Sequence, residues 1–301
     1  MTQSPLVIVV VGPTAVGKTN VAIRIAQQFQ TEIISADSRQ FYKQLQIGTA
    51  TPSAFELSQA KHHFIANLNI TDDYNISKYE VEALACAQSL FERYQKLVLV
   101  GGSGLYIDAF CNGIDVLPDP DAQLRTDLKE KLQLQGIESL RIDLKALDPD
   151  YYAQVDLANP NRIMRALEVI LQTGIPYSQL RKRQIKPRPF RVCKIGLMRE
   201  REQMYDLINR RVDIMMENGL LHEAEQLFPN RHLNALNTVG YKELFSYLEG
   251  SITLPQAIED IKTHSRRYAK RQLTWFLKDK EIRWFTPENL KDIFDYICTV
   301  E

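Results

Sequence analysis

Eight residues near the start of this 301-residue chain have the types and the spacing of a phosphate-binding loop. The segment GPTAVGKT, residues 12–19, fits the pattern G-x-x-x-x-G-K-[ST]. In such a loop, backbone N–H groups and a helix N-terminus surround a phosphate, the lysine adds positive charge, and the final hydroxyl can bind Mg²⁺. The alternative is a glycine-rich turn without a ligand. We expect a phosphate or diphosphate to be bound by Gly12, Pro13, Thr14, Ala15, Val16, Gly17, Lys18 and Thr19.

Two further polar residues follow strands that the sequence predicts. Asp37 comes just after a short apolar run, and Ser103 follows the run 97–100. Ligands of open α/β sheets lie at the carboxyl ends of the strands, so both side chains should face the loop. Many nucleotide triphosphatases carry a metal-binding carboxylate at such a strand end, where this chain has Gly-Gly-Ser-Gly. The set therefore favours proton removal with diphosphate release over ATP hydrolysis, unless both are ordinary turn residues.

An arginine interrupts the apolar side of a helix expected at 200–218. A helical wheel places Arg211 in the middle of the arc that contains Met204, Ile208 and Met215. Burying an isolated charge is very costly, so Arg211 needs a carboxylate or an anionic ligand. A structural ion pair is one interpretation, and a bidentate grip on a diphosphate is the other.

The elements that must position these residues alternate between strands and helices in the first part of the chain. Apolar runs predict buried strands at 6–11, 32–35, 97–100, 190–197 and 282–285, and a helix is expected to open at Ser77 with Val81 facing inward. This alternation indicates an α/β core with a parallel sheet. Strand character is missing between about 117 and 189, where helices are expected at 121–135 and 161–173. We therefore expect an α/β core at 1–116, an all-helical insertion at 117–189, and the remainder of the core with a basic C-terminal helix at 190–301.

The charges sum to zero, with 37 basic and 37 acidic residues, but they are unevenly distributed. Residues 116–195 contain 14 basic and 10 acidic residues, whereas the segments before and after each have an acidic excess of two. The stretch 181–191 has six cations and no acid, and the helix expected at 256–278 gathers further cations with no acidic residue between Ile261 and Lys278. Solvated charged faces are common, yet two acid-free basic stretches in a balanced chain favour a polyanionic partner such as RNA. The helix cations are Lys262, Arg266, Arg267, Lys270 and Arg271.

Several classes of protein are excluded by composition and spacing. No apolar run reaches the ~18–20 residues of a membrane span, and the N-terminus lacks the form of a signal peptide. The four cysteines and five histidines show no zinc-ligand spacing and no disulfide framework. We expect a cytoplasmic protein without a membrane partner.

Motifs along nearly the whole chain resemble those of the tRNA dimethylallyltransferases, also called tRNA isopentenyltransferases, of the bacterial type. The matching segments are 12–19, 37–42, 47–50, 62–63, 101–106, 161–168, 239–243 and 269–275. The resemblance implies a P-loop NTPase-like α/β core with a parallel sheet and an all-helical insertion that binds the tRNA anticodon stem-loop. It implies transfer of a dimethylallyl group from dimethylallyl diphosphate to N6 of the adenosine 3′ to the anticodon, with release of diphosphate.

The resemblance also assigns roles to individual residues. Asp37 resembles the general base, and Lys18, Thr19 and Arg211 resemble the groups that hold the diphosphate and Mg²⁺, the one cofactor expected. Ser103 stands where the family usually has threonine, and its hydroxyl resembles a contact to metal or substrate. We expect a monomer. The predicted tRNA contacts are Asp37, Ser38, Arg39, Gln40, Ser103, Arg125, Asn161, Arg162, Ile163, Met164, Arg165, Asn237, Thr238, Val239, Gly240, Tyr241, Lys242, Lys270 and Arg271.

Two further departures from the family pattern concern local contacts. Thr51 replaces a common lysine, and Lys61 replaces a common proline before the histidine pair. Two rival functions stay open from the residues alone. A P-loop kinase would bind ATP or GTP and phosphorylate a hydroxyl, and a non-catalytic RNA-binding module would bind RNA whatever its loop residues.

Overall fold

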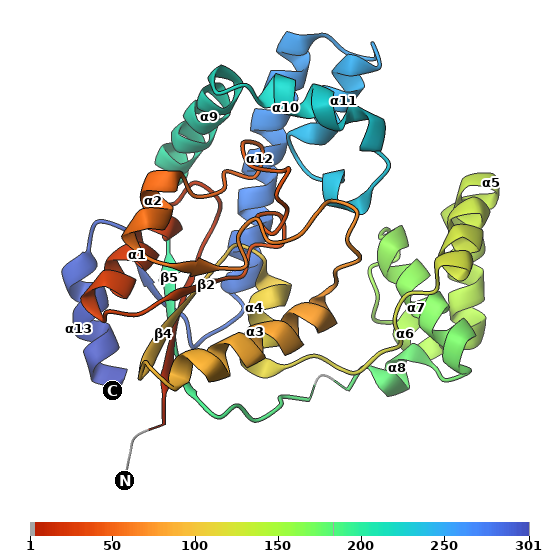
Figure 1. Ribbon diagram of the computed structural model, residues 1–301. Helices are drawn as coiled ribbons and strands as arrows, with labels where there is room; N and C mark the ends of the chain where they lie inside the picture. Colours follow the sequence, from red (N-terminus) through yellow and green to blue (C-terminus); the bar gives the residue numbers. More distant parts are fainter. Residues whose placement is uncertain (1–3, 183, 301) are drawn as a thin grey trace. The chain divides into compact units, whose positions relative to one another are not determined.

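A parallel β-sheet forms the centre of the larger of two compact units, Met1–Cys111 with Arg188–Glu301 (Figure 1). The computed structural model describes residues 4–182 and 184–300. Within these ranges the sheet has six strands in the order β3-β2-β4-β1-β5-β6, and neighbouring strands are parallel. The strands are β1 (Leu6–Val11), β2 (Ile33–Ser35), β3 (His62–His63), β4 (Lys96–Val100), β5 (Arg191–Leu197) and β6 (Arg283–Phe285).

The predicted α/β class and the P-loop NTPase-like core are confirmed. The strand β1 runs through the glycine-rich loop into the helix α1 (Lys18–Gln28), which is the strand–loop–helix unit of that fold. Five strands lie within a residue or two of their predicted positions. The short strand β3 escaped prediction because two adjacent histidines carry no apolar pattern.

Helices cover both faces of the sheet, which is why all six residues of β1 are buried. Even-numbered residues of β1 share an apolar cluster with α1 and α13 (Leu290–Val300). Odd-numbered residues face α3 (Ile76–Phe91) and α4 (Gly104–Asn112). The loops that follow the strands therefore all emerge at one edge of a rigid, two-sided core.

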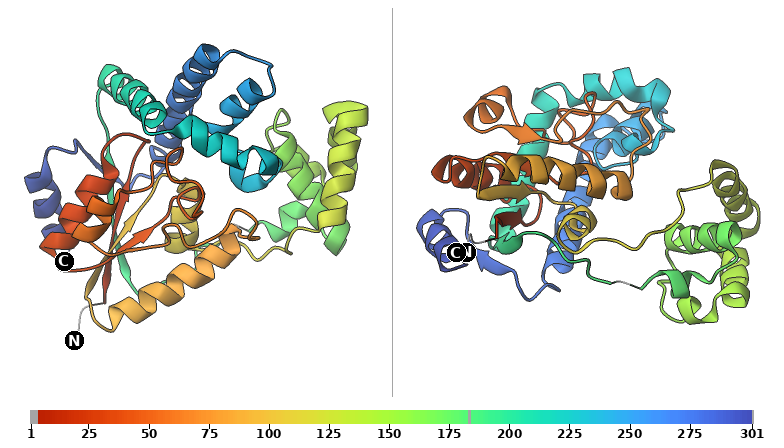
Figure 2. Two further views of the ribbon diagram at one scale, coloured as in Figure 1. Left: turned by 45° about the horizontal axis from the view of Figure 1, so that its top comes forward. Right: turned by 60° about the horizontal axis from the view of Figure 1, so that its bottom comes forward.

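Helices from the last third of the chain stand over the carboxyl ends of the strands (Figures 1 and 2). A separate apolar cluster holds them together and includes Tyr42 and Leu45 from the segment after β2. The same segment leads into α2 (Ala54–Gln59). The helical layer comprises α9 (Arg201–Glu217), α10 (Leu220–Leu227), η1 (Phe228–Asn230), η2 (Asn234–Leu236), α11 (Tyr241–Leu248) and α12 (Leu254–Phe276).

The second compact unit, Asn112–Pro187, has only helices as regular elements in its described part and corresponds to the insertion expected at 117–189. Its own apolar cluster is formed chiefly by α5 and α7. At Gly136 the backbone takes φ +75° and kinks α5, where the sequence predicted a break. The helices are α5 (Ala122–Leu147), α6 (Pro149–Tyr152), α7 (Pro160–Thr173) and α8 (Tyr177–Leu180).

Helix α3 begins earlier than predicted, and one residue that was predicted to face inward is exposed. Asn75, not Ser77, is the N-cap, and its side chain accepts a hydrogen bond from the Lys78 N–H. The predicted inward residue Val81 is 69% exposed, whereas Tyr79 is fully buried against Phe41. The stacked aromatic rings rotate the helix, so the prediction for Val81 was wrong.

No helix in the described ranges has the length and apolarity to cross a membrane.

Candidate active site

The glycine-rich loop is shaped by two glycines that no other residue could replace without strain. At Gly12, φ is +148° and an added Cβ would lie 2.6 Å from the carbonyl oxygen of Leu197. Gly17 takes φ +109° as the N-cap of α1. The loop thus turns the chain from β1 into α1 and directs amides toward the carboxyl edge of the sheet. Among the described residues, no hydrogen bond to another backbone group is found for the N–H groups of Ala15, Gly17, Lys18 and Thr19.

Lys18 folds back over this loop. Its ammonium donates to the carbonyl oxygens of Gly12, at 3.1 Å, and Pro13, at 2.8 Å. Burial lowers the pKa of Lys18 to about 8, with Asp37 opposing the shift and Arg211 adding to it. A cation held in this way is poised to gain an anionic partner.

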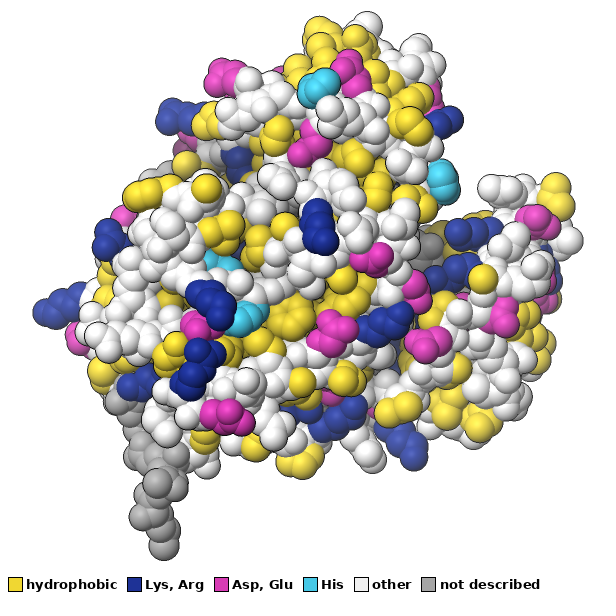
Figure 3. Space-filling view, in the orientation of Figure 1, with side chains coloured by type: hydrophobic (Ala, Val, Ile, Leu, Met, Phe, Trp, Pro, Cys, Tyr) yellow, Lys and Arg dark blue, Asp and Glu magenta, His cyan; other side chains and the backbone are white. Residues whose placement is uncertain are grey.

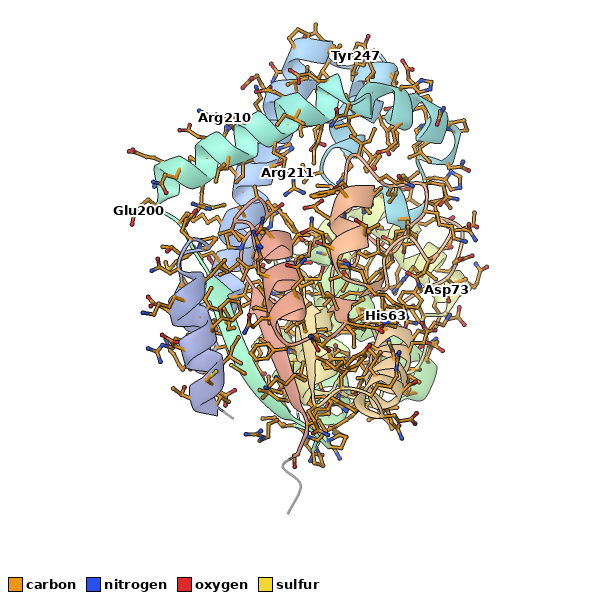
Figure 4. The ribbon with its side chains drawn as sticks, turned by 60° about the vertical axis from the view of Figure 1, so that its left-hand side comes forward. His63, Asp73, Glu200, Arg210, Arg211 and Tyr247 are labelled. Atoms are coloured by element: carbon orange, nitrogen blue, oxygen red, sulfur yellow. The ribbon has the colours of Figure 1, made fainter. Side chains whose placement is uncertain are left out.

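Arg211 points from α9 toward the loop, while its neighbour Arg210 lies on the opposite, exposed side of the helix (Figure 4). Its guanidinium donates to Thr14 Oγ1 at 3.1 Å. Across the described ranges no carboxylate lies within 4.0 Å of it, so the structural ion pair considered from the sequence is not found. Burial lowers the pKa of Arg211. The structure therefore holds an inward-facing cation that hydrogen-bonds one hydroxyl.

Asp37 lies two residues beyond the end of β2. Its Oδ1 accepts a hydrogen bond from the Arg39 N–H at 3.1 Å, so the predicted turn role is real. The same carboxylate lines the cavity described next. A turn therefore fixes the backbone while the carboxylate faces the site.

A cavity of about 380 Å³ unites most of the predicted catalytic residues at the carboxyl edge of the sheet. Phosphate-loop residues, Asp37 and Arg211 line it, together with the segment 49–53. A larger groove of about 560 Å³ lies at β6 and α13 and contains none of the predicted site residues. The predicted residues that line the smaller cavity are Thr14, Ala15, Gly17, Lys18, Thr19, Asp37, Gln40 and Arg211.

Ser103 is placed differently from the prediction. It does not line the cavity, and its hydroxyl accepts the Ser38 N–H at 3.1 Å and lies 3.1 Å from Ser38 Oγ. Thr19 does line the cavity. The predicted pairing of Thr19 and Ser103 as metal ligands is therefore not what this geometry supports, because Ser103 instead links the loop after β4 to the turn at Asp37.

The sequence reasoning missed Gln272, which joins two loops of the site. Its Oε1 accepts the Thr14 N–H at 2.8 Å, and its Nε2 donates to the Gly102 carbonyl at 2.9 Å. An added Cβ at Gly102 would lie 2.3 Å from that Nε2, so a larger residue there would displace the amide from this position. Gln272 follows the cations Lys270 and Arg271 on α12, and the available sequence signal was a polar side chain on the buried face of that helix.

Arg39 was predicted to contact tRNA, but its guanidinium has backbone partners. It donates to the carbonyl oxygens of Asn234, Ala235 and Asn237 at 2.9–3.3 Å. These bonds tie the turn after Asp37 to the segment before α11. Carbonyl acceptors leave no trace in sequence, so this role could not be predicted.

Two other predicted tRNA contacts are wrong for the side chains. Ile163 and Tyr241 are both 0% exposed, in the apolar clusters of the helical unit and of the α9–α12 layer. Gly240 is also buried, and Thr238, Val239 and Met164 are half-buried. Asn161, Arg162, Asn237 and Lys242 are exposed.

In the helical unit, Arg125 and Arg165 share one partner. Both guanidinium groups lie 3.0 Å from Oε2 of Glu168, a carboxylate that is 1% exposed. The two arginines are partly exposed on their other sides. One buried negative charge for two cations leaves a net positive site that can attract an RNA phosphate.

The basic stretches are only partly available to a polyanion. On α12, Lys262 pairs with Asp213 and Glu259. Arg188 forms an inward ion pair with Glu80 at 2.7 Å, and Arg183 lies outside the described residues. On the face of the larger unit seen in Figure 3, acidic and basic side chains are dispersed. Within α12, the exposed cations are Arg267, Lys270 and Arg271.

The departures at Thr51 and Lys61 both have local partners. Thr51 Oγ1 donates to the Leu45 carbonyl at 3.3 Å, and Lys61 lies 3.3 Å from Glu32. Neither removes a residue from the cavity, which Thr51 itself lines.

Comparisons with known proteins agree with one another. A family model described as IPP transferase matches residues 40–279. The chain is 51% identical to tRNA dimethylallyltransferase 1 of Bacteroides thetaiotaomicron, over 97% of this chain and 95% of that protein. It is 50% identical to tRNA dimethylallyltransferase of Christiangramia forsetii, over 98% of each.

Solved structures give the same result. The full-length tRNA isopentenylpyrophosphate transferase of Bacillus halodurans aligns with a TM-score of 0.72 at 35% identity, covering 99% of this chain and 96% of that one. A eukaryotic dimethylallyltransferase, described as acting on tRNA, aligns with a TM-score of 0.78 at 26% identity, covering 96% and 75%.

Proposed function

Because this chain belongs to the IPP transferase family, we propose that it transfers a dimethylallyl group from dimethylallyl diphosphate to N6 of the adenosine 3′ to the anticodon in tRNA. The observation that carries the proposal is that cationic side chains able to bind a diphosphate and a carboxylate able to accept a proton line the same cavity. Lys18 and Arg211 supply the positive charge, and Asp37 supplies the base. The relatives that are named for this activity share about half of their residues with this chain over nearly their full length.

The reaction exchanges one bond for another within this cavity. The N6 amine attacks the first carbon of the dimethylallyl group, the bond from that carbon to the diphosphate oxygen breaks, and diphosphate leaves with the electron pair. Asp37 accepts the proton that N6 loses. Loop amides, Lys18 and Arg211 stabilise the charge that develops on the leaving diphosphate.

A divalent metal fits the oxygen donors present, and we propose Mg²⁺. Magnesium is usually bound by one or two protein oxygens together with substrate phosphates and waters. The Thr19 hydroxyl lines the cavity, and no group of three His, Cys, Asp or Glu residues that could hold a metal ion occurs in the described ranges, so the substrate phosphates and waters would complete the coordination. When bound, the metal supplies further charge for the diphosphate.

Recognition of tRNA is proposed to combine extrusion of the target base with phosphate contacts around it. An adenine in a stacked loop cannot reach a cavity unless it leaves its stack. The exposure of the predicted residues Arg162, Lys242 and Lys270 supports the proposal that they contact the tRNA backbone. We also propose that the protein acts as a monomer, and a tRNA substrate supports a cytoplasmic location.

Neutralising the exposed end of α12 is expected to weaken tRNA binding and to lower its salt dependence. Lys270→Gln with Arg271→Gln removes two cations that have no ion pair within the described ranges. If both bind phosphates, the slope of log K against log salt should fall by roughly one for each phosphate that is no longer neutralised. Binding titrations at several salt concentrations measure this, with Lys280→Gln and Lys291→Gln, at two other exposed lysines, combined as the charge-matched control. An unchanged slope would show that this face is only solvated.

Binding of dimethylallyl diphosphate is expected to take up a proton above pH 8. Lys18 has a pKa of about 8 in the free protein, and a bound diphosphate beside it raises that pKa. Below pH 8, Lys18 is protonated in both states. Above it, binding must add the proton, so affinity falls as pH rises through about 8.

Calorimetry in two buffers of different ionisation enthalpy measures this proton uptake. Lys18→Met retains only the proton exchange of the ligand itself and serves as the control. Equal uptake by the two proteins would contradict the role given to Lys18.

An assay with competing substrates tests the proposed function against a kinase. The protein is incubated with unmodified tRNA, Mg²⁺ and either dimethylallyl diphosphate or ATP. We expect prenylated adenosine and released diphosphate with the first, and no phosphorylated product with the second. Phosphate transfer from ATP without prenylation would replace this proposal with the kinase.

A further inference from the structure

One carboxylate on α10, that of Glu223, accepts hydrogen bonds from the backbone of a loop that leads into the cavity wall. Oε2 of Glu223 accepts the N–H groups of Gln46, at 3.1 Å, and Ile47, at 2.9 Å. Oε1 accepts the N–H of Gly48 at 3.0 Å and the hydroxyl of Tyr241 at 2.6 Å. Four donors on one carboxylate make charge-assisted bonds, which are stronger than neutral ones.

Tyr241 and Gly48 complete this clamp. Tyr241 is fully buried, and burial beside Glu223 raises the pKa of its hydroxyl, which therefore remains a donor. A Cβ added at Gly48 would lie 2.6 Å from the Tyr241 ring, so only glycine allows this approach. The clamp is thus defined by Glu223, Tyr241 and Gly48.

The clamped residues lead directly into the wall of the cavity. The Ala50 N–H donates to the Ile47 carbonyl, and the Thr51 N–H donates to the Gln46 carbonyl, both at 3.0 Å. On the other side, Gln40 Nε2 donates to the carbonyls of residues 49 and 50, at 3.2 and 3.0 Å. The segment 49–53 lines the same cavity as the phosphate loop. Its position therefore depends on Glu223 through an unbroken series of hydrogen bonds.

We propose that Glu223 is a positioning residue for the prenyl diphosphate, acting through the loop 46–53. This inference rests on the proposed function, because it names the substrate that the loop encloses. It also changes the interpretation of the motif at 239–243. The resemblance assigned Tyr241 to tRNA binding. In the structure its hydroxyl donates to Glu223 and its ring packs against Gly48 of the loop.

The test separates the two substrates kinetically. Glu223→Gln retains one oxygen acceptor and places an amide group against N–H donors, so part of the clamp is lost. The KM for dimethylallyl diphosphate should rise about tenfold, as expected for losing one charge-assisted bond, while kcat and the KM for tRNA stay nearly unchanged. Glu225→Gln is the matched control, since Glu225 is exposed on the same helix with only His222 as an ion-pair partner in the described ranges.

A measurement without catalysis keeps the proposal testable by itself. Hydrogen exchange of the amides at 46–48 should accelerate in Glu223→Gln and stay unchanged in Glu225→Gln. Gly48→Ala, which forces the loop off the Tyr241 ring, should reproduce both the kinetic and the exchange changes. Normal exchange at 46–48 in Glu223→Gln would overturn the clamp.

The remaining outcomes are also distinct. A rise in the KM for tRNA with an unchanged KM for dimethylallyl diphosphate would overturn the proposal and return this motif to tRNA binding. If the wild-type protein prenylates no tRNA, the proposed function fails, and the exchange experiment still decides whether Glu223 holds the loop.

Discussion

Asp37→Asn is expected to lower the kcat of adenosine prenylation by ~10²–10⁴-fold, the range that a general base contributes. The asparagine oxygen can still accept the Arg39 N–H, so the turn that carries residue 37 should persist. What disappears is a group that can take the N6 proton. Steady-state kinetics with both substrates measure the loss, alongside direct binding of tRNA, which should be almost unaffected.

Asp73→Asn is the control for this experiment. The Asp73 side chain is 90% exposed and its only ion pair in the described ranges is with Lys78, so removal of its charge should leave kcat unchanged (Figure 4). A large loss of tRNA affinity with normal turnover in Asp37→Asn would assign Asp37 to RNA binding and leave the reaction without its base.

Arg211→Leu is expected to weaken diphosphate binding by roughly 10²-fold or more, as found when one partner of a buried charge pair is truncated. Inhibition by inorganic diphosphate and the KM for dimethylallyl diphosphate both measure this. The ligand-free protein should become more stable to heat, because the variant removes an inward-facing charge that has no carboxylate within 4.0 Å in the described ranges.

The control is Arg210→Leu, one residue earlier and on the outer side of α9 (Figure 4). It should change neither diphosphate binding nor the KM. A collapse of stability in Arg211→Leu with unchanged diphosphate binding would show that the guanidinium is structural.

The sequence was most informative where a function depends on neighbouring residues. The phosphate loop is a local motif whose glycines, Gly12 and Gly17, are explained by their own backbone angles. Arg211 could be predicted from a helical wheel because a cation on an apolar arc conflicts with burial. The insertion was visible as a loss of strand character, and the structure gives a compact unit, Asn112–Pro187, in nearly the same place.

Long-range polar contacts were beyond such reasoning. Gln272, Arg39 and Glu223 each bond backbone groups of residues more than 150 positions away. Every residue type except proline, which lacks the N–H, offers both backbone groups, so no pattern of side chains reveals the partner. The cavity wall and the links between its loops could therefore be found only in the structure.

The sequence also failed to predict details of α3, where contacts with distant residues overrode the local signals for the helix start and its buried face. The sequence predicted that helix α3 opens at Ser77, whereas the fold uses Asn75 as its N-cap. Its buried face follows Tyr79, which stacks on Phe41 with ring centroids 5.5 Å apart, so Val81 turns to solvent. Burial of a large aromatic side chain contributes more to stability than burial of a single valine, so the aromatic contact decides which side of the helix faces the core.

The central claim is that this cavity joins a dimethylallyl group to one adenosine of tRNA. The most direct test incubates the protein with dimethylallyl diphosphate, Mg²⁺ and unmodified tRNA, and then locates the modification by mass spectrometry of tRNA fragments. We predict N6-dimethylallyladenosine immediately 3′ to the anticodon, with one diphosphate released for each group transferred. Absence of prenylated adenosine from every tRNA that has an adenosine at that position would contradict the claim.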